Sequence, residues 1–572
     1  MRKARLIIVI AIIAVVFGVC FSACSKNQNY IERQDLVVSR FGDGITVLES
    51  HAASTTAKEY RDQPRVKAKI NVDTRLSGYH ITGIYLPAGE ALTIDVPNAV
   101  MGAGYNVLVS NFSAGTRITR QISRVRTTIK AEDEPMGGVV EIWISEAAAS
   151  SFNMTIEGGI IMPYYRLGRD AVTQIESGGG DYAILDCVNT RFYIPTDVLY
   201  DEKKECVIRD DINKSLSWWQ SAVSFFNETL EIPSNSIEYT SSVVFGDYGA
   251  TLRYDVDREA VVADKVYFES FLAYENLIQG KAWDLLYAIC EHKVDVSENF
   301  SSVSAETMIA DILCSIDNVV MTHYDVAIES DWKWLIDPYS CLERTLQILE
   351  NGEGLYDNTD LIRAFFINIM HSFGLDKTIK IIIAYGKTVS DDQSNASNDV
   401  LALNISEELG ADMSLYCEKF GLALSADTKK KMSGNIMYIP VQTKFTVGSS
   451  ESYSMGYTIP MGEKSTFDFA SNIVTMADEE WNIVGLEGDS RLWSMEDGIY
   501  YYMPSTDKLT DEFELKLRNG ENSVTLFGKI NVLITVATYK IYENWKFDNT
   551  STALDEALAA YQKRTPDYTG SI

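Results

Sequence analysis

The alternation of apolar and polar residues divides the chain into three regions. In the first, from 70 to 165, short alternating runs are broken by Gly and Pro, which is typical of β-strands joined by turns. The segment 83–96 shows this pattern on both sides of Pro87. Further strands are expected at 105–109, 117–122 and 138–144. The pattern predicts an N-terminal β-sandwich over 70–165.

In the second region, apolar residues recur at three and four positions, the period of an amphipathic helix. In the segment 361–373, for example, the apolar residues form one stripe. They are Phe365, Phe366, Ile369, Met370 and Phe373. The other helices are expected at 212–230, 271–294, 305–320 and 377–385. We therefore expect a mostly helical domain over 166–434.

In the third region, from 435 to 572, the alternation of period two returns. It is clear at 513–517 and at 524–530, and a short helix is expected at 553–562. We interpret this region as a C-terminal β-sandwich with a terminal helix. The whole pattern predicts a multidomain α+β protein.

The first residues carry a targeting signal. Three basic residues precede an apolar run over 6–21, which is shorter than the ~20 residues of a spanning helix. Phe21-Ser22-Ala23-Cys24 resembles the lipobox of bacterial lipoproteins, so 1–23 is expected to be a signal peptide and Cys24 the lipidated residue. The polar segment 24–69 then serves as a tether. The alternative is an uncleaved signal anchor, and both interpretations place the body outside the cytoplasm, in the bacterial cell envelope, at the cell surface or outer membrane.

Charge and composition exclude one class of partner. The chain has 80 acidic and 50 basic residues, a formal net charge of -30, and no basic cluster beyond its first residues. Such a surface repels phosphate backbones, so nucleic acid is not an expected partner. The hydrophobic share of 46% is ordinary for a folded protein and argues against a disordered chain.

The cysteines beyond Cys24 are widely spaced and contain no CxxC pair, which argues against a zinc ribbon. Cys187 and Cys206 flank an expected hairpin, so they are the best candidates for a disulfide. Cys290 and Cys314 fall in helical patterns, where a buried free thiol is the commoner outcome.

Several short segments, taken in order, resemble one known family. They are Thr82-Gly83-Ile84-Tyr85-Leu86-Pro87-Ala88-Gly89-Glu90, Met136-Gly137-Gly138, Ile160-Ile161-Met162-Pro163-Tyr164-Tyr165, Trp218-Trp219, His371-Ser372-Phe373-Gly374-Leu375, Tyr385, Ser406-Glu407-Glu408-Leu409-Gly410-Ala411-Asp412 and Phe420-Gly421-Leu422-Ala423-Leu424-Ser425. Over about 70–432 their order and spacing resemble the enhancin-like, mucin-directed zinc metallopeptidases, metallopeptidase family sixty. The resemblance implies a gluzincin-like metallopeptidase fold for the central domain.

The catalytic motif of such peptidases is missing from this sequence. An HExxH helix places two imidazoles on one face to hold zinc, and its glutamate activates the metal-bound water. The chain contains no HExxH, and no two of its five histidines are four residues apart. They are His51, His80, His292, His323 and His371.

The resemblance nevertheless indicates where the site would lie. In the family a tryptophan stands four residues before the first zinc ligand, so Trp283 implies a first ligand at Tyr287. The general base would then be Ala288 and the second ligand Glu291, and Glu306 has a spacing that suits the third ligand. A phenol and two carboxylates are a poor zinc set, and alanine cannot move a proton.

Shifting this alignment by one residue does not restore a site. His292 would become the second ligand, but Ala288 would then be the first and Ile289 would replace the base. Glu306, Glu291 and His292 remain as residual candidate metal ligands, and a solvated surface histidine is the simpler interpretation of His292. No metal or other cofactor is expected, and zinc would be the cofactor if the site were active.

Aromatic side chains offer a different chemistry, because the apolar faces of sugar rings stack on them. The candidates for such a platform are Trp332, Trp334, Trp493, Tyr500, Tyr502 and Trp545. The competing interpretation is that these residues alternate between core and surface of strands.

We therefore expect a lipid-anchored envelope protein with a metallopeptidase-like fold, a pseudoenzyme that binds glycoproteins or glycans of the mucin type. One alternative is an active zinc metallopeptidase that cleaves O-glycoproteins with an atypical site. Another is a structural envelope lipoprotein that assembles with other envelope proteins.

Overall fold

The computed structural model describes residues 45–47 and most of 60–533. The longer undescribed stretches within the second range are 132–136, 171–174, 176–178, 233–239, 323–332, 336–340, 389–394, 440–444, 448–451, 461–464, 470–472, 476–480 and 505–509. Cys24, Trp332, Trp545 and the helix expected at 553–562 thus lie outside the described residues. The chain forms two compact units: unit 1 comprises Met1–Gln220 and Ile232–Leu272, and unit 2 comprises Ser221–Glu231 and Ala273–Ile572.

Unit 1 begins with two antiparallel five-stranded sheets. The first contains, in spatial order, β1 (Ile45–Val47), β2 (Val66–Asp73), β9 (Ser151–Glu157), β4 (Ala91–Asp95) and β7 (Arg126–Lys130). The second contains β10 (Ile160–Ile161), β3 (Gly78–Leu86), β8 (Gly138–Ile144), β5 (Asn106–Asn111) and β6 (Thr116–Gln121). Side chains from both sheets, such as Ile70 of β2 and Ile142 of β8, form one buried core. The predicted α+β class with a β-rich N-terminal region is confirmed.

The two faces of β3 both lie in the interior of unit 1. Ile84 and Leu86 belong to the core between the two sheets, whereas Ile81 and Tyr85 belong to a second cluster. This second cluster contains residues of a third sheet, such as Tyr193. The second sheet is therefore the middle layer of three, and its strands can be apolar on both sides.

The third sheet of unit 1 corrects the expectation of a mostly helical region from 166 onward. It contains β11 (Tyr164–Arg166), β12 (Tyr182–Cys187), β13 (Thr190–Pro195), β14 (Ser241–Gly246), β16 (Ala260–Asp264) and β15 (Leu252–Asp255). β12 and β16 are buried at every position, so their sequences show no alternation. Short apolar runs of this kind have no diagnostic period, which is why the pattern missed them.

Helix α3 (Ile212–Thr229) agrees with the helix predicted at 212–230, and its residues up to Gln220 belong to unit 1. The indole of Trp219 is fully buried, packs edge-on against Phe192 of β13, and donates a hydrogen bond to the carbonyl of Phe271 (2.8 Å). Asn189 at the β12–β13 turn donates to the carbonyl of Gln220 (2.8 Å). These contacts hold α3 against the third sheet. Shorter elements of unit 1 are η3 (Asn98–Val100), α2 (Thr196–Leu199), η7 (Lys265–Tyr267) and α4 (Phe268–Leu272).

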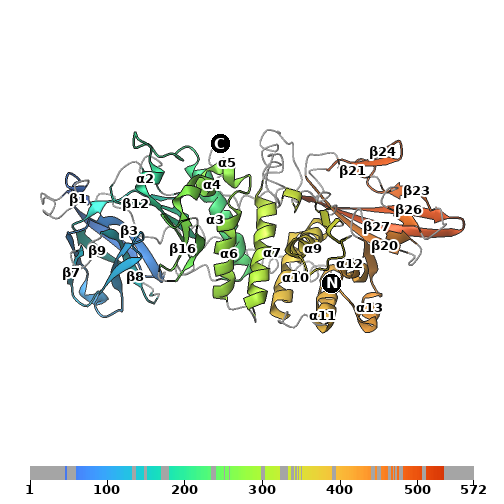
Figure 1. Ribbon diagram of the computed structural model, residues 1–572, viewed down its shortest axis with the longest axis horizontal. Helices are drawn as coiled ribbons and strands as arrows, with labels where there is room; N and C mark the ends of the chain where they lie inside the picture. Colours follow the sequence, from blue (N-terminus) through green and yellow to red (C-terminus); the bar gives the residue numbers. More distant parts are fainter. Residues whose placement is uncertain are drawn as a thin grey trace, which may run out of the picture. The chain divides into compact units, whose positions relative to one another are not determined.

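Unit 2 contains the remaining helices (Figure 1). They are α5 (Tyr274–Leu277), α6 (Trp283–Ser297), α7 (Val303–Met321), η8 (Lys333–Leu335), α9 (Thr359–Phe373), α10 (Leu375–Thr388), α11 (Asn395–Leu409), α12 (Ser414–Lys419) and α13 (Ala426–Met432). α9 shows why the periodic segments form helices: Asn358 caps its N-terminus by accepting from the amide of Asp360, and its apolar stripe is buried. No helix of the described residues is long and apolar enough to cross a membrane.

A six-stranded mixed sheet in unit 2 packs against these helices. Its spatial order is β17 (Ala411–Asp412), β18 (Ile436–Ile439), β20 (Ser452–Pro460), β27 (Asn522–Leu533), β26 (Thr510–Asn519) and β23 (Asn482–Glu487). Ser372 of α9 bonds to the hydroxyl of Tyr438, and a Cβ on Gly456 would lie 2.6 Å from the Ser372 carbonyl oxygen. The region from 435 onward is thus part of the same unit as the helices. The other strands of unit 2 are β19 (Phe445–Val447), β22 (Ile473–Thr475), β21 (Ser465–Phe467), β25 (Ile499–Tyr502) and β24 (Trp493–Glu496).

The expected disulfide between Cys187 and Cys206 is not present. Both cysteines are free and buried, and the Cys187 thiol donates to the carbonyl of Thr190 (3.4 Å) within the β12–β13 turn. Cys206 instead pairs through its backbone with Tyr200. The spacing predicted a hairpin between the two cysteines, but the hairpin closes directly after Cys187. Cys290 and Cys314 are buried free thiols, as predicted.

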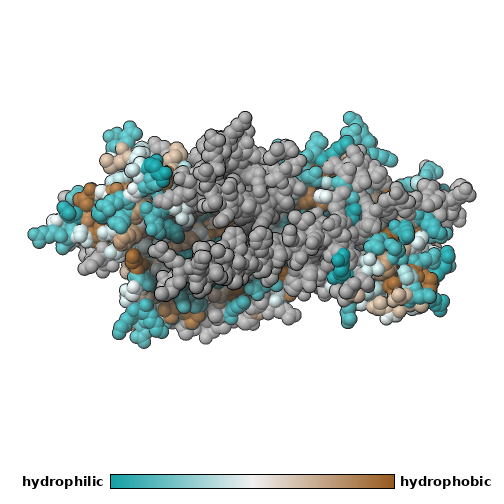
Figure 2. All heavy atoms as spheres, turned by 180° about the vertical axis from the view of Figure 1, so that it is seen from behind, coloured by the Kyte–Doolittle hydropathy of each residue, from teal (hydrophilic) through white to brown (hydrophobic). Residues whose placement is uncertain are grey.

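The described surface carries apolar residues singly or in small groups. On the face shown in Figure 2, hydrophobic residues stand between hydrophilic ones. Met495 and Val484 of unit 2 are among the more exposed, at 62% and 54%. Scattered residues of this kind are normal on a folded surface and do not by themselves indicate a binding face.

Candidate functional site

Helix α6 carries the positions at which the resemblance places the metal site. Its sequence buries one stripe that includes Leu286, Ile289 and Cys290. Asp284 lies in the first turn, where its negative charge interacts favourably with the positive end of the helix dipole. Ala288, the position of the general base, faces this buried stripe and has no group that could move a proton. Glu291, the position of the second ligand, is exposed.

Tyr287, the position of the first ligand, is half-buried and acts as a phenol rather than a phenolate. Burial, followed by the negative charges of Glu291 and Asp311, raises the pKa of Tyr287 to about 12. A neutral phenol is a weak metal ligand, because metal binding requires the deprotonated oxygen. Asp311 lies on α7, so the carboxylate of α7 that acts on Tyr287 is one that the sequence did not single out.

Asp311 is bound by an arginine. Arg363 of α9 donates from Nε to Oδ2 of Asp311 (2.8 Å) and from Nη2 to Oδ1 (2.6 Å). The same guanidinium lies over the ring of Trp283, the first residue of α6, at 5.2 Å from the centroid. Its Nη1 also donates to Asp360 (3.3 Å). One arginine thereby contacts side chains of α6 and α7 from its own helix α9.

Glu306, the candidate third ligand, lies in the first turn of α7. Burial and then the charge of Asp295 raise the pKa of Glu306. Asp295 is two turns beyond Tyr287 on α6, a distance of ~12 Å along the helix. The charge that acts on Glu306 is thus that of Asp295, and the main carboxylate charges that act on Tyr287 are those of Glu291 and Asp311.

A zinc ion does not fit the side chains at these positions. Ala288 offers no donor, Tyr287 keeps its proton, and the carboxylate of Asp311 is committed to Arg363. Among the residues that the structure describes, no group of three His, Cys, Asp or Glu side chains is placed to hold a metal ion.

His292, the ligand of the shifted alignment, is mostly buried. Burial, and then the charge of Lys293, lowers the pKa of His292 to about 4. The charge of Asp295 opposes this shift but does not cancel it. His292 is therefore neutral at physiological pH, and it is not the solvated surface residue that the simpler interpretation expected.

This shift predicts a pH dependence of stability for unit 2. The folded state binds a proton at His292 only below about 4, whereas the unfolded chain binds it near 6.5. Stability is therefore complete above pH 6.5 and falls as the pH decreases towards 4, by about 1–2 kcal/mol after allowance for partial exposure. Urea unfolding at pH 7 and pH 4.5 measures this loss. His292→Gln should reduce the difference between the two pH values, and an unchanged difference would contradict the assignment.

The aromatic candidates for sugar stacking are mostly core residues. Tyr500 and Tyr502 are exposed by only 8% and 0%, and alternate with the half-buried Tyr501 along β25. Trp493 packs against Tyr502 and Phe513, with ring centroids at 5.0 and 4.8 Å. The prediction of a platform is thus corrected for Tyr500 and Tyr502, whose rings fill a strand core. Trp334 in η8 is half-buried.

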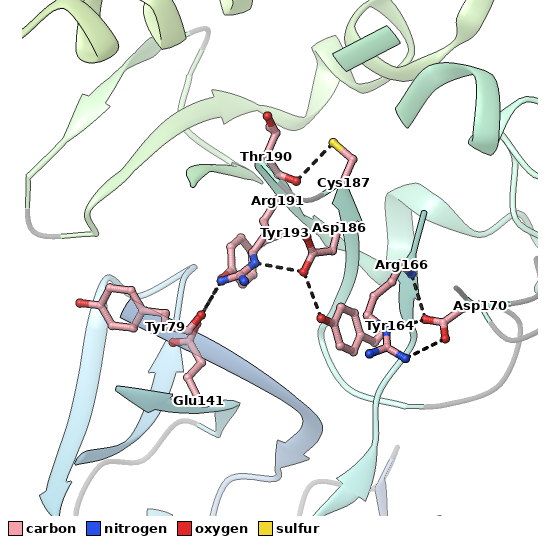
Figure 3. A network of polar contacts seen from close by, with 10 residues as sticks. All are labelled: Tyr79, Glu141, Tyr164, Arg166, Asp170, Asp186, Cys187, Thr190, Arg191 and Tyr193. Carbon is pink, nitrogen blue, oxygen red and sulfur yellow. Dashed lines mark hydrogen bonds and ion pairs between the residues drawn. The ribbon is translucent and has the colours of Figure 1, made fainter. Parts of the chain in front are cut away.

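A polar network joins the sheets of unit 1 (Figure 3). Arg191 of β13 donates from Nε to Asp186 of β12 (3.1 Å) and from Nη1 to the carbonyl of Tyr79 of β3 (2.7 Å). Tyr164 donates to the same Asp186 oxygen (3.0 Å). The Asp186 carboxylate, against the opposing effect of burial, raises the pKa of Arg191. The network is buried and its charges are paired with one another, so its role is structural.

Glu141 of β8 extends these contacts. It accepts from Tyr193 of β13 (3.1 Å) and from Ser110 of β5 (2.5 Å). Arg117 in turn donates to Ser110 (3.2 Å) and to the hydroxyl of Tyr79 (2.9 Å). Every one of these side chains contacts another sheet or strand, so the second and third sheets of unit 1 are joined by polar as well as apolar contacts.

The first two sheets match a known domain. Residues 61–157, which run from the segment before β2 to the end of β9, match the family model of the N-terminal domain of M60-like peptidases. Thr82, Glu90 and the Gly137-Gly138 pair lie within this range. A search of the curated proteins gives no match.

Solved structures with a similar arrangement include three from bacteria. The catalytic module of the metalloprotease ZmpA from Clostridium perfringens is 12% identical, with a TM-score of 0.40, over 84% of this chain and 99% of that chain. A metallopeptidase from Bacteroides thetaiotaomicron is 10% identical, with a TM-score of 0.47, over 84% and 89%. A functionally unknown conserved protein from Bacillus anthracis is 12% identical, with a TM-score of 0.45, over 80% and 94%.

These solved structures share a general likeness with the chain, whereas the family match concerns the segment that holds the Gly-Gly strand and the Gly-Glu turn. Residues 61–157 thus match the N-terminal domain of M60-like peptidases, and over this segment the predicted resemblance to that family is confirmed.

Proposed function

We propose that the chain is a non-catalytic relative of the M60-like peptidases, anchored in the bacterial envelope through a lipid on Cys24, that binds glycoproteins or glycans of the mucin type. The observation that carries the proposal is the composition of α6, where Tyr287, Ala288 and Glu291 stand in place of two imidazoles and a general base. Hydrolysis by a zinc-bound water needs all three of those groups.

The environment of these residues supports the same proposal. The pKa of Tyr287 is about 12, so its oxygen remains protonated at neutral pH. The α7 carboxylate that acts on it, Asp311, is bound in a bidentate manner by Arg363. An envelope protein that has the scaffold of a mucin-directed peptidase, but not its chemistry, can still retain the substrate. Tyr500 and Tyr502 are buried, and the half-buried Trp493 packs against Tyr502 and Phe513, so we assign this role to the half-buried Trp334.

The test combines zinc analysis, cleavage and retention. The full chain in detergent is incubated with mucin, and cleavage is followed by electrophoresis while retention is measured on mucin beads with and without chelator. We expect retention that does not depend on chelator, no cleavage, and less than one zinc per chain. A matched pair of variants, Trp334→Ala and Trp493→Ala, separates binding from folding, because only the first is expected to weaken retention without lowering thermal stability.

Two outcomes favour the alternatives. Chelator-sensitive cleavage of an O-glycoprotein, abolished by Glu306→Ala, would indicate an active peptidase with an atypical site and overturn the proposal. No retention of mucin, together with envelope proteins that purify stably with the chain, would indicate a structural lipoprotein.

A further inference from the structure

Three helices of unit 2 meet at the guanidinium of Arg363. The group makes two parallel hydrogen bonds to Asp311 of α7 and lies over the indole of Trp283 of α6. The side chains of Arg363 and Asp311 are exposed by only 21% and 13%, so this ion pair is largely withdrawn from water. Such a planar, bidentate pair that also covers an aromatic face is specific to arginine.

The junction lies next to the positions that correspond to the metal site. Trp283 and Tyr287 are one turn apart on α6, and the charge of Asp311 acts on the Tyr287 phenol. A divalent ion at such a place has two effects: it neutralises the carboxylate of one helix, and it ties that helix to its neighbours. Arg363 is a cation of the chain itself that has both effects: it neutralises the Asp311 carboxylate and ties α7 to α6 and α9.

We propose that Arg363 is the resident cation of this junction: it fastens α6, α7 and α9 without a metal, and it keeps Asp311 from serving as a metal ligand. The proposal rests on the proposed function, because it explains how the scaffold remains folded after the loss of the zinc site. The role of Arg363 also goes beyond the proposed function, because it predicts that zinc binds only weakly at this junction even when two histidines are introduced on α6.

Arg363 and a metal ion would compete for one carboxylate, that of Asp311. Both oxygens of Asp311 accept from Arg363, so a metal ion would either bind beside a fixed positive charge or displace the guanidinium. The displaced arginine would lose its bidentate partner and keep the longer bond to Asp360 (3.3 Å). Arginine cannot release its charge by deprotonation, so it would remain as a repelling cation beside the metal.

The first experiment measures thermal unfolding of the full chain in detergent. The parent chain should show the same Tm with chelator, with added zinc and with neither. Arg363→Met should lower the Tm by roughly 4–8 °C, and Arg363→Lys by less, because an ammonium keeps the charge but not the fork. The matched control is Lys380→Met, which breaks the exposed Lys380–Glu408 pair (3.3 Å) and should change the Tm by less than about 1 °C.

The second experiment measures zinc binding by competition with a chromophoric chelator. Tyr287→His and Glu291→His together place two imidazoles four residues apart on α6. In this background, Arg363→Met should raise zinc affinity at least about tenfold, because Asp311 becomes free as a third ligand. A retained fold is checked by circular dichroism, and Asp360→Asn, which leaves the Asp311 pair intact, should not raise the affinity.

The outcomes separate the two proposals. The role of Arg363 would be overturned if Arg363→Met left the zinc affinity of the two-histidine variant unchanged, or if chelator lowered the Tm of the parent chain. If chelator left the Tm of the parent chain unchanged but abolished a cleavage of mucin, the proposed function alone would be overturned, because the metal would then act at another site of the chain.

Discussion

Replacing Arg191 by methionine should destabilise unit 1 by about 3–5 kcal/mol, because it leaves the buried carboxylate of Asp186 without its guanidinium partner. The side chains of Arg191 and Asp186 are exposed by only 3% and 6%. After the substitution, Tyr164 still donates to Asp186, but the carbonyl of Tyr79 loses the Arg191 Nη1 donor. Calorimetry should show the transition of unit 1 at a Tm lower by roughly 10 °C.

A double variant distinguishes the loss of an ion pair from a loss of packing. Arg191→Met with Asp186→Leu removes both charges, so most of the stability should return, since apolar residues can replace a buried pair at little cost. Lys67→Met is the exposed control: the Lys67–Glu157 pair (3.1 Å) should contribute less than about 1 kcal/mol. A loss below about 1 kcal/mol for Arg191→Met would show that Asp186 finds water or another donor.

Gly137→Ala should cost about 3 kcal/mol, because the position has no room for a methyl group. A Cβ there would lie 2.1 Å from the carbonyl oxygen of Leu86 and 2.6 Å from the amide nitrogen of Ala88. These are backbone atoms of the turn after β3, so they cannot move aside as a flexible side chain could. The neighbouring Gly138 is similarly close to the carbonyl oxygen of Ser110 (2.5 Å).

Urea unfolding of Gly137→Ala measures this cost, with Gly434→Ala as the control. Gly434 has no heavy atom within 4 Å of a built Cβ among the described residues, so its substitution should leave stability unchanged or slightly higher. Similar stabilities for the two variants would mean that β3 and β8 can separate freely. The expected difference gives the Gly-Gly motif of this family segment a physical reason: two strands approach closer than a side chain allows.

The helices and the N-terminal strands were predictable because local signals mark them: apolar residues at helical spacing, or short runs bounded by Gly and Pro. The segment 361–373 has an apolar stripe, and α9 occupies Thr359–Phe373. The segment 138–144 coincides with β8, Gly138–Ile144. The third sheet of unit 1 was missed because strands such as β12 are buried on both faces and read as plain apolar runs.

The sequence predicted which positions of α6 form the candidate site, but it did not predict which side chains of other helices contact them. Trp283 does begin α6, and Tyr287 follows one turn later, as the resemblance implied. The partners of these residues come from helices whose pairing no periodicity reveals: Asp311 from α7 and Arg363 from α9. The available signal for these partners was that Asp311 and Arg363 are charged residues next to the apolar stripes of their predicted helices, where a charge is usually paired.

The place of β27 in the sheet of unit 2 affects how this unit can be made. β27 is the last described strand, yet it lies between β20 and β26, with a parallel register to β20 from Ser452↔Thr525 to Pro460↔Leu533. Contacts between segments so distant in sequence form late and slow the folding of a domain. During synthesis, β20 must wait with one edge unpaired until residues near 533 emerge. A nascent chain halted before Asn522 would therefore expose strand edges that invite aggregation.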